Sequence, residues 1–408
     1  MSNPYDIVII GGGVSGLYAR WRLSIRYPNL RVLLLEKKPF FGGRIKQRKL
    51  GSTTVQLGAG VIRSNKDTTL MGILSEIGLT TSDSISKGQH CFRPSNFKET
   101  MRRLSVDMTD TKGKSFEHWI TERLGQKEAD RFITTMGYTD MIEADAEHTM
   151  RYYGLEDNDF STQHSYSFIN GGWMALINRL LESGHGDALT SSEVLGLSKT
   201  ADDIIQVSTF NQTISCRRLL ICTTAMFFRN TEFVGSHRPD RSLDHIPALI
   251  ETWIGSVPFV RIYVKLDGPL SVSMSDILIV ADECRKIIPI NRKDGVLMLV
   301  YSDSQDALHW KRIMESKSEV DVKRELTSRL RKHGICNREV ITYLGTFWSD
   351  GIHYFKPLAN DNPDWLSHLR NPSPNVFIGG EMVATKQGWV NGTLECIDEI
   401  LESFAKAQ

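Results

Sequence analysis

The sequence predicts an α/β fold in which one domain is assembled from three segments and a second, α+β domain is built from two insertions. Two observations lead to this prediction. An apolar run over residues 7–10 enters a glycine-rich turn, and a second apolar run ends at Glu36. Further strand patterns followed by glycine-rich turns recur in the middle and near the end of the chain. Strands that alternate with helical patterns in this way are typical of a largely parallel sheet covered by helices.

The glycine-rich turn has the spacing G-x-G-x-x-G, with glycines at Gly11, Gly13 and Gly16. The first glycine allows a tight turn, the second lets the backbone approach a pyrophosphate, and the third lets the next helix pack on the strand. We expect that helix over residues 14–27, with Val14 and Ser15 at its positive end facing the phosphates.

An acidic residue closes the second strand of this unit. The strand is expected over residues 31–35, and Glu36 stands 20 residues after Gly16, followed by Lys37. At that distance an acid accepts hydrogen bonds from the ribose hydroxyls of an adenosine. The segment therefore predicts a Rossmann-like dinucleotide site, and by itself it allows NAD as readily as FAD.

Composition narrows the class of protein. The 408 residues suffice for two domains with sizeable cores, and the formal net charge of +1 gives no global attraction to nucleic acid or to an anionic membrane. The six cysteines form no C-x-x-C pair, which indicates reduced thiols in a cytoplasmic protein. We expect no signal peptide, because the first strand is predicted almost at the start of the sequence, and no membrane span, because the longest apolar stretch, near residues 219–228, is too short for one.

The strand patterns divide the chain into five parts. Nucleotide-binding signals fall in residues 1–84, 171–257 and 345–408, which we expect to form one domain. The insertions, residues 85–170 and 258–344, are expected to form the substrate domain, the first largely helical and the second a strand region followed by helices. A small substrate commonly binds between two such domains.

Four further motifs extend over nearly the whole length of the chain. They are Phe41-Gly-Gly-Arg44, Leu57-Gly-Ala-Gly-Val61, Phe377-Ile-Gly-Gly-Glu381 and Gly388-Trp-Val-Asn-Gly392. Together with the opening fingerprint, their order and spacing resemble the flavin-dependent amine oxidase superfamily, which includes monoamine and polyamine oxidases. The resemblance implies an FAD-binding domain of the glutathione-reductase type.

The resemblance also implies which residues surround the FAD. Arg44 would place a fixed charge near the pyrophosphate or the flavin, Glu381 would hold the ribityl chain or ribose, and Val194 would contact adenine through its backbone. The expected cofactor-binding residues are Gly11, Gly13, Val14, Ser15, Gly16, Glu36, Lys37, Gly43, Arg44, Gly58, Ala59, Gly60, Val61, Val194, Gly380, Glu381, Trp389 and Val390.

The chain departs from the family pattern at three places. Gln56 stands where the family has an acid, and Arg261 stands at the position of a strand lysine that oxidases of this group place near the flavin. An alignment shifted by a few residues would make Lys265 the counterpart instead. Arginine cannot lose its proton as a buried lysine can, so oxygen activation would be altered. Covalently flavinylated members of this family use a cysteine in the region before the last strand, and none lies between residues 347 and 376. The resemblance therefore implies noncovalent FAD.

Aromatic residues are expected around the substrate, because a dry aromatic pocket lowers the pKa of an amine. The candidate walls are Trp348, Tyr354, Phe355 and Trp389, of which we expect about two in the site. Together with Arg261, three of them (Trp348, Tyr354 and Trp389) form the expected catalytic set. His353 is a weaker candidate as a proton acceptor, because a single histidine is more often structural.

Acidic residues gather between residues 140 and 159. They are Asp140, Glu143, Asp145, Glu147, Glu156, Asp157 and Asp159, against one basic residue, Arg151. In a substrate domain such a rim would steer a diamine or polyamine, although charge runs are usually solvated faces.

The resemblance implies an FAD enzyme that oxidises an amine with O2 and releases an imine and H2O2, without a nucleic-acid partner. One alternative keeps the fold and dehydrogenates carbon–carbon or ring bonds, as desaturases and protoporphyrinogen oxidases do. Another is a non-enzymatic protein similar to the GDP-dissociation inhibitors, which Glu36, Arg44 and Glu381 argue against.

Overall fold

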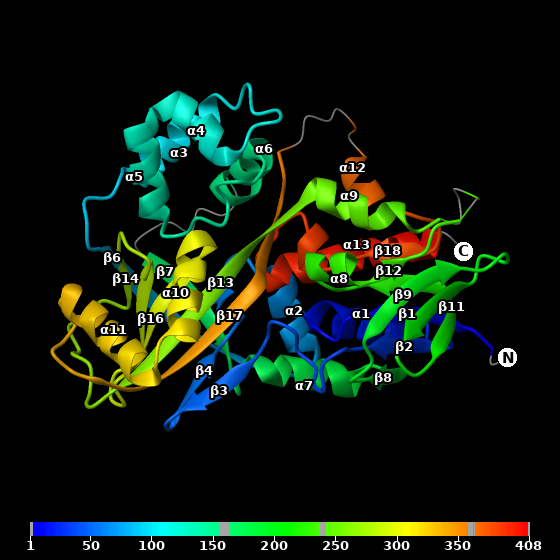
Figure 1. Cartoon of the computed structure of the whole chain (residues 1–408), viewed down its shortest axis with the longest axis horizontal. Helices are drawn as coiled ribbons and strands as arrows, with labels where there is room; N and C mark the ends of the chain where they lie inside the picture. The colour runs from blue at the N-terminus through cyan, green and yellow to red at the C-terminus, as the bar shows by residue number, and fades with distance from the viewer. Residues whose placement is uncertain are drawn as a thin grey trace.

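The computed structural model describes residues 3–155, 163–236, 238, 242–357, 362 and 364–406. Within these residues the chain forms two eight-stranded sheets and a small helical lobe (Figure 1). Each sheet draws on strands that are far apart in the sequence, so neither can form from one continuous stretch of chain.

The first sheet joins three parts of the chain. Its order is β12-β9-β10-β11-β1-β2-β8, and β18 also pairs with β11. The central strands β1, β2, β11 and β18 are parallel to one another. The strands are β1 (Tyr5–Ile10), β2 (Val32–Leu35), β8 (Asp187–Leu189), β9 (Val194–Lys199), β10 (Ile205–Thr209), β11 (Thr213–Ile221), β12 (Glu232–Phe233) and β18 (Val376–Ile378).

Helices cover this sheet because its central strands are apolar on both faces. Ile7, Val8 and Ile9 are fully buried, as expected for a strand inside a parallel sheet. Helices α1 and α13 contribute Leu17 and Leu394 to the same core. The helices of this unit are α1 (Val14–Arg26), α2 (Thr68–Glu76), α7 (Trp173–Ser183), α8 (Ala225–Asn230), α9 (His245–Trp253), α12 (Trp365–Arg370) and α13 (Val390–Lys406).

The second sheet has the order β17-β13-β16-β15-β14-β6-β7-β5. Helices α10 (Ser304–Ser316) and α11 (Glu319–Lys332) pack on it through Trp310, Leu326 and Leu330 (Figure 1). The strands are β5 (Ile62–Arg63), β6 (Thr81–His90), β7 (Gln163–Ile169), β13 (Ile254–Leu266), β14 (Ile277–Ile279), β15 (Lys286–Asn291), β16 (Val296–Asp303) and β17 (Val340–Phe355). A separate hairpin pairs β3 (Gln47–Leu50) with β4 (Thr53–Gln56).

A helical lobe lies apart from both sheets and has its own core (Figure 1). It contains α3 (Phe97–Val106), α4 (Phe116–Leu124), α5 (Gln126–Met136), α6 (Ala146–Thr149) and a π-helical turn, η1 (Met150–Leu155). Helices α3, α4 and α6 begin at side-chain caps: Asn96, Ser115 and Asp145 each accept a hydrogen bond from a backbone N–H of the first turn. Trp119 and Phe132 are fully buried between them.

Two of the expected domain boundaries fall inside strands. The boundary at residue 257 lies within β13, and the boundary at residue 344 lies within β17, because both strands continue as one antiparallel pair from Ile254 to Leu266. Nothing in the local sequence marks these crossings. No helix among the described residues has the length and hydropathy that a membrane crossing requires.

Candidate active site

A cavity of about 1010 Å³ lies along the end of the first sheet and continues to the second. Its lining includes the β1–α1 turn, the segment after β4, the start of α13, and residues of β6, β7, β13 and β15. A cavity of this size suffices for a long cofactor together with a small substrate. All the cofactor-binding residues expected from the sequence line it except Gly16 and Gly380.

The glycines of the β1–α1 turn have different roles. Gly11 has a φ of +107°, and a Cβ there would lie 2.3 Å from the carbonyl oxygen of Cys222. A Cβ on Gly16 would lie 2.0 Å from the oxygen of Gly11. A Cβ on Gly13, in contrast, would have no neighbour nearer than the Cα of Gly43, 4.0 Å away. Gly11 and Gly16 are therefore required by packing, whereas Gly13 leaves space in the cavity.

The first turn of α1 opens into that space. Val14 and Ser15 line the cavity, and no side chain caps the helix at Gly13. Uncapped N–H groups at a helix start favour an anion. The open position at Gly13 and the uncapped helix together fit the pyrophosphate of a dinucleotide.

Glu36 is held by backbone donors at the same end of the cavity. Its Oε2 accepts from the N–H of Gly12 at 2.7 Å and its Oε1 from the N–H of Lys38 at 2.8 Å. The backbone oxygen of Glu36 accepts from the N–H of Ser192 at 2.8 Å, which brings Val194 to this region. Lys37 lines the cavity beside Glu36.

An ionic cluster in the wall of the cavity joins three distant segments, with Glu381 and His353 buried and Arg44 partly exposed. Arg44 donates from Nη2 to Oε2 of Glu381 at 2.9 Å and from Nη1 to the oxygen of Gly351 at 2.9 Å. Glu381 also accepts from the N–H of His353 at 3.1 Å and of Gly388 at 3.0 Å. Burial opposes the charge of Glu381, but Arg44 and His353 hold its pKa well below the ordinary value.

His353 does not act on the cavity directly. It is fully buried, its Nδ1 lies 2.5 Å from Oε2 of Glu381, and its Nε2 accepts from the N–H of Ala225 at 3.2 Å. These partners assign the proton to Nδ1. Both ring nitrogens are occupied, so His353 orients Glu381 and is not available as the proton acceptor considered from the sequence.

The segment after β4 brings backbone close to the cavity. A Cβ on Gly58 would lie 1.5 Å from the oxygen of Arg44, and one on Gly60 would lie 3.3 Å from Nη1 of Arg261. Ala59 and Val61 also line the cavity. Trp348 fixes this segment by donating from Nε1 to the oxygen of Leu57 at 2.9 Å.

Of the two candidate cations on β13, only Arg261 reaches the cavity. Arg261 donates from Nη1 to the oxygen of Gln56 at 3.0 Å and from Nη2 to the hydroxyl of Tyr301 at 3.1 Å. Lys265 donates to the oxygen of Asp294 at 2.9 Å and does not line the cavity. The two residues share a strand face but stand about 13 Å apart along it. Lys265 therefore does not lie where the family's strand lysine is expected, beside the cavity.

Two of the four expected aromatic walls line the cavity. Trp348 and Trp389 do, and Trp389 stacks on the guanidinium of Arg63 at 3.7 Å. Tyr354 and Phe355 do not, so two of the four candidates lie at the cavity, the number expected, and Tyr354 of the expected catalytic set lies outside it.

Strand register explains the difference. Trp348 pairs with Phe259, whereas Tyr354 pairs with Gly255, further along β13. There the hydroxyl of Tyr354 donates to Glu143 at 2.7 Å, and Phe355 is fully buried in the core of the first sheet.

The closing motif places the start of α13 at the cavity. Gly388 has a φ of +78° and donates its N–H to Glu381, so the chain turns sharply before Trp389 and Val390. The helix starts at Val390. Its N-terminal end therefore faces the cavity with its favourable positive potential.

Most of the described acidic residues from the segment 140–159 form contacts outside the cavity. Glu143 accepts from Tyr354, Asp145 caps α6, and Glu147 pairs with Arg151 at 2.8 Å. Glu156, Asp157 and Asp159 lie outside the described residues. Asp140 alone among the described members lines the cavity.

Asp140 belongs to a group of residues that sequence reasoning did not bring together. Tyr138, Tyr301, Phe259 and Lys286 line the same part of the cavity and come from separate elements. Burial, reinforced by the charge of Asp303, raises the pKa of Asp140 to about 7. No local motif announces such a group, because its members meet only through the pairing of β13, β15 and β16.

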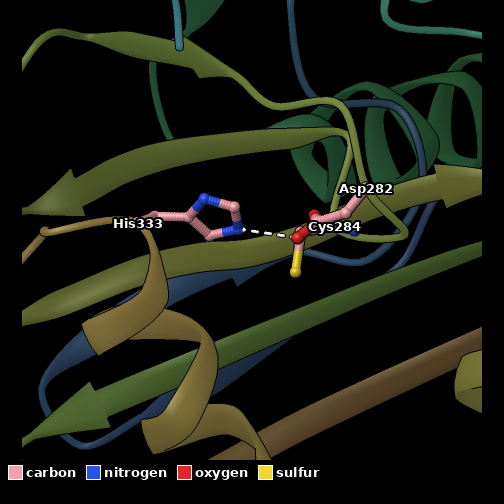
Figure 2. Close-up of side chains that lie close together, drawn as sticks. All are labelled: Asp282, Cys284 and His333. Carbon is pink, nitrogen blue, oxygen red and sulfur yellow. Dashed lines mark hydrogen bonds and ion pairs between the residues drawn. The ribbon is translucent and has the colours of Figure 1, made fainter. Parts of the chain in front are cut away.

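A second polar cluster lies away from the cavity. Asp282, Cys284 and His333 offer ligand atoms within 4.8 Å of one another, and Figure 2 shows the contact between His333 and Asp282. Asp282 already accepts from Lys332 at 2.7 Å and faces His333 at 3.0 Å. Burial also raises the pKa of the Cys284 thiol. Cations beside Asp282 and a protonated thiol favour an ion-pair cluster over a metal centre.

The fold and the cavity agree with a comparison against known families. The profile of the flavin-containing amine oxidoreductases matches residues 14–395. The chain belongs to this family. The cofactor of this family is FAD, and the residues around Gly13, Glu36 and Glu381 fit it. The chain is an FAD-dependent oxidoreductase.

Two curated relatives match short parts of the chain. An uncharacterised mimivirus protein, R188 of Acanthamoeba polyphaga mimivirus, is 44% identical over 59 residues, which are 14% of this chain and 12% of the relative. A probable flavin-containing monoamine oxidase A of Dictyostelium discoideum is 32% identical over 90 residues, 22% of this chain and 19% of the relative. The matched part thus spans less than a fifth of the length of each of these two curated relatives.

Solved structures of amine oxidoreductases share the whole fold. A putrescine oxidase bound to putrescine superposes with a TM-score of 0.78 at 17% identity, covering 99% of both chains. A cyclohexylamine oxidase from Brevibacterium oxydans IH-35A gives 0.76 at 15% identity, also covering 99% of both. At these identities the likeness establishes the fold.

Proposed function

We propose that the protein oxidises an amine to an imine with O2 as the electron acceptor, releasing H2O2. The observation that carries the proposal is one continuous cavity that joins a dinucleotide cradle at Gly13 and Glu36 to an aromatic end at Trp348 and Trp389. Family membership and the amine oxidase structures of the same fold support it.

In this proposal the cradle residues hold FAD without a covalent bond. Gly13 and the first turn of α1 receive the pyrophosphate, Glu36 receives the adenosine ribose, and Val194 lies at the adenine end. The Arg44–Glu381 pair and the start of α13 stabilise the flavin end. When bound, the flavin supplies a two-electron acceptor for the carbon beside the amine nitrogen.

The chain's own residues prepare the amine. Trp348 and Trp389 exclude water, and a dry site lowers the pKa of an ammonium so that the reactive neutral amine is favoured. Arg261 adds a fixed positive charge at the Gln56–Gly60 segment, where its guanidinium is held by Gln56 and Tyr301. The atoms balance as amine plus O2 giving imine plus H2O2.

Arg261 also favours a second candidate function. An arginine in place of a lysine cannot exchange a proton at physiological pH. A dehydrogenase that acts on carbon–carbon or ring bonds and passes electrons to an acceptor other than O2 would tolerate this replacement.

Reduction of the bound flavin separates these functions. The purified protein, yellow with FAD, is mixed anaerobically with monoamines, diamines and polyamines, and its absorbance near 450 nm is followed. Bleaching by an amine and recovery in air, with H2O2 formed, supports the amine oxidase. Bleaching without recovery in air supports an amine dehydrogenase. No bleaching by any amine rejects amine oxidation and favours the dehydrogenase that acts on carbon–carbon or ring bonds. If the purified protein is colourless and takes up no FAD, both flavin-dependent functions are rejected.

A further inference from the structure

We propose that Asp140 binds a second, cationic nitrogen of the substrate, so that the preferred substrate is a diamine whose distal ammonium pairs with this carboxylate. The inference rests on the proposed amine oxidation and adds a specificity-determining residue to it. Asp140 lines the cavity in the connection between α5 and α6.

The first support is an unsatisfied oxygen. Oδ1 of Asp140 is buried and has no hydrogen-bond partner in the structure, and Asp140 forms no ion pair among the described residues. A buried carboxylate oxygen without a donor is unfavourable by itself. A ligand that brings both an N–H donor and a positive charge removes that penalty.

The second support is the contrast with the other carboxylates of the cavity. Glu36 and Glu381 accept backbone N–H groups, Asp67 is paired with Arg63, Asp276 with Arg292, and Asp350 with Arg229. Glu193 is exposed to solvent. Asp303, behind Asp140, is bound by the N–H of Thr139 at 3.1 Å and does not line the cavity. Asp140 is thus the lining acid with a buried oxygen left for a ligand.

The third support comes from the charges around Asp140. Arg261 and Lys286 also line this part of the cavity, and Nζ of Lys286 lies 3.3 Å from the ring centroid of Tyr138. Without an acid, these two cations would repel an ammonium. Burial and the charge of Asp303 raise the pKa of Asp140, whereas Lys286 and the backbone N–H groups of Asp140 and Met141 act in the opposite direction. A ligand ammonium beside the carboxyl would add to the charges that favour its ionised form, and the ionised carboxylate would offset the repulsion.

The geometry also agrees with the chemistry of a diamine. The reacting nitrogen must be neutral, which the aromatic walls favour, whereas the distal nitrogen keeps its proton in water and requires a counter-charge. The rings of Tyr138 and Tyr301 pack edge to face at 5.7 Å beside Asp140, and their faces suit the methylene chain of a linear diamine.

A pair of substrates of equal length tests the proposal. kcat and KM are measured for 1,4-diaminobutane and butylamine with the FAD-loaded enzyme, its Asp140→Asn variant and a control, Glu143→Gln. Glu143 is an acid of the same segment that contacts Tyr354 outside the cavity. We expect Asp140→Asn to lower the diamine-to-monoamine ratio of kcat/KM by about tenfold or more, mainly through KM. Glu143→Gln should leave the ratio unchanged.

Three outcomes would overturn the proposal. They are an equal loss for both amines, no change in the ratio, and the same loss in Glu143→Gln. Asp140→Glu, which keeps the charge, should retain most of the preference, and a loss equal to that of Asp140→Asn would also count against it.

Binding separates this inference from the oxidase proposal. If the wild-type enzyme oxidises neither amine, the oxidase function fails, and thermal unfolding with each amine present tests Asp140 alone. Stabilisation by the diamine over butylamine that Asp140→Asn abolishes supports the site. The absence of such a difference in the wild-type protein rejects it.

Discussion

Glu381 and Asp140 both reach the cavity, but their surroundings drive their pKa values in opposite directions. Glu381 is surrounded by Arg44, His353 and two backbone donors, which keep it charged in spite of its burial. Asp140 has a buried oxygen without a donor and a second acid nearby, so its pKa rises to about 7. A carboxylate that the protein satisfies serves the architecture, whereas one that it leaves unsatisfied is available to a ligand.

The largest effect is expected at the satisfied carboxylate. Glu381→Ala removes the partner of Arg44 and His353, and breaking a buried ion pair costs about 3–5 kcal/mol. We expect a loss of that size in the free energy of urea unfolding, together with loss of bound FAD. The control is Glu399→Gln, which removes the ion-pair partner of Arg370. The side chain of Glu399 is 53% exposed. That change should cost less than about 1 kcal/mol.

A pair of glycine variants separates the fold from the cofactor cradle. Gly13 has a φ of −77°, which any residue adopts, so Gly13→Ala should fold normally and bind FAD roughly tenfold more weakly, about 1.4 kcal/mol. In Gly11→Ala the new Cβ would clash with the carbonyl oxygen of Cys222, and the backbone φ of +107° disfavours alanine. This variant should therefore lose folding stability, in contrast to Gly13→Ala. Flavin titration with circular dichroism measures both. Equal FAD affinity in Gly13→Ala and the wild type would contradict the assignment.

The raised pKa of Asp140 predicts a pH-dependent stability. In the unfolded chain a carboxyl titrates near pH 4, and in the folded chain this one titrates near 7. The folded state therefore holds its proton more tightly, so the contribution of Asp140 to stability is full below about pH 4 and is lost as the pH rises through 7. We expect the stability of Asp140→Asn relative to the wild type to increase from pH 5 to pH 8. A constant difference across this range in urea unfolding would contradict the raised pKa.

The smallest effect is expected at Asp282, a satisfied carboxylate away from the cavity. Burial opposes its charge, but His333 and Lys332 hold its pKa below the ordinary value. Its contribution is therefore present above about pH 4 and is lost as the pH falls below that. Asp282→Asn should cost about 1 kcal/mol at pH 7 and less at pH 3, with unchanged FAD content. A fall in FAD content, or a lower melting temperature after chelator treatment, would point to a different role.

Local motifs predicted the parts of the site that depend on backbone shape. Gly13, Glu36, Arg44 and the Gly388–Val390 turn line the cavity as expected because each lies beside a strand end whose position follows from the first sheet. The chemistry of a turn can be recognised in a single segment, since the glycine and its neighbours act together.

Side chains on the second sheet were harder to place. Trp348 and Tyr354 lie on the same strand, and only the register of β17 against β13 decides which of them faces the cavity. Likewise, Asp140 is one of seven acids in its segment, and the cavity selects it through strands that are distant in the sequence. Register and long-range pairing are not encoded in local periodicity.

The β13–β17 pair gives the molecule a mechanical property. One end of this ribbon, at Ile254 and Phe355, is buried in the core of the first sheet, and its middle, at Val260 and Ile262, is buried in the core of the second. Bending the two units apart would break backbone hydrogen bonds of this pair, which has a register shift between Val257 and Phe259. Opening of the cavity to a substrate should therefore come first from side chains and loops at its mouth.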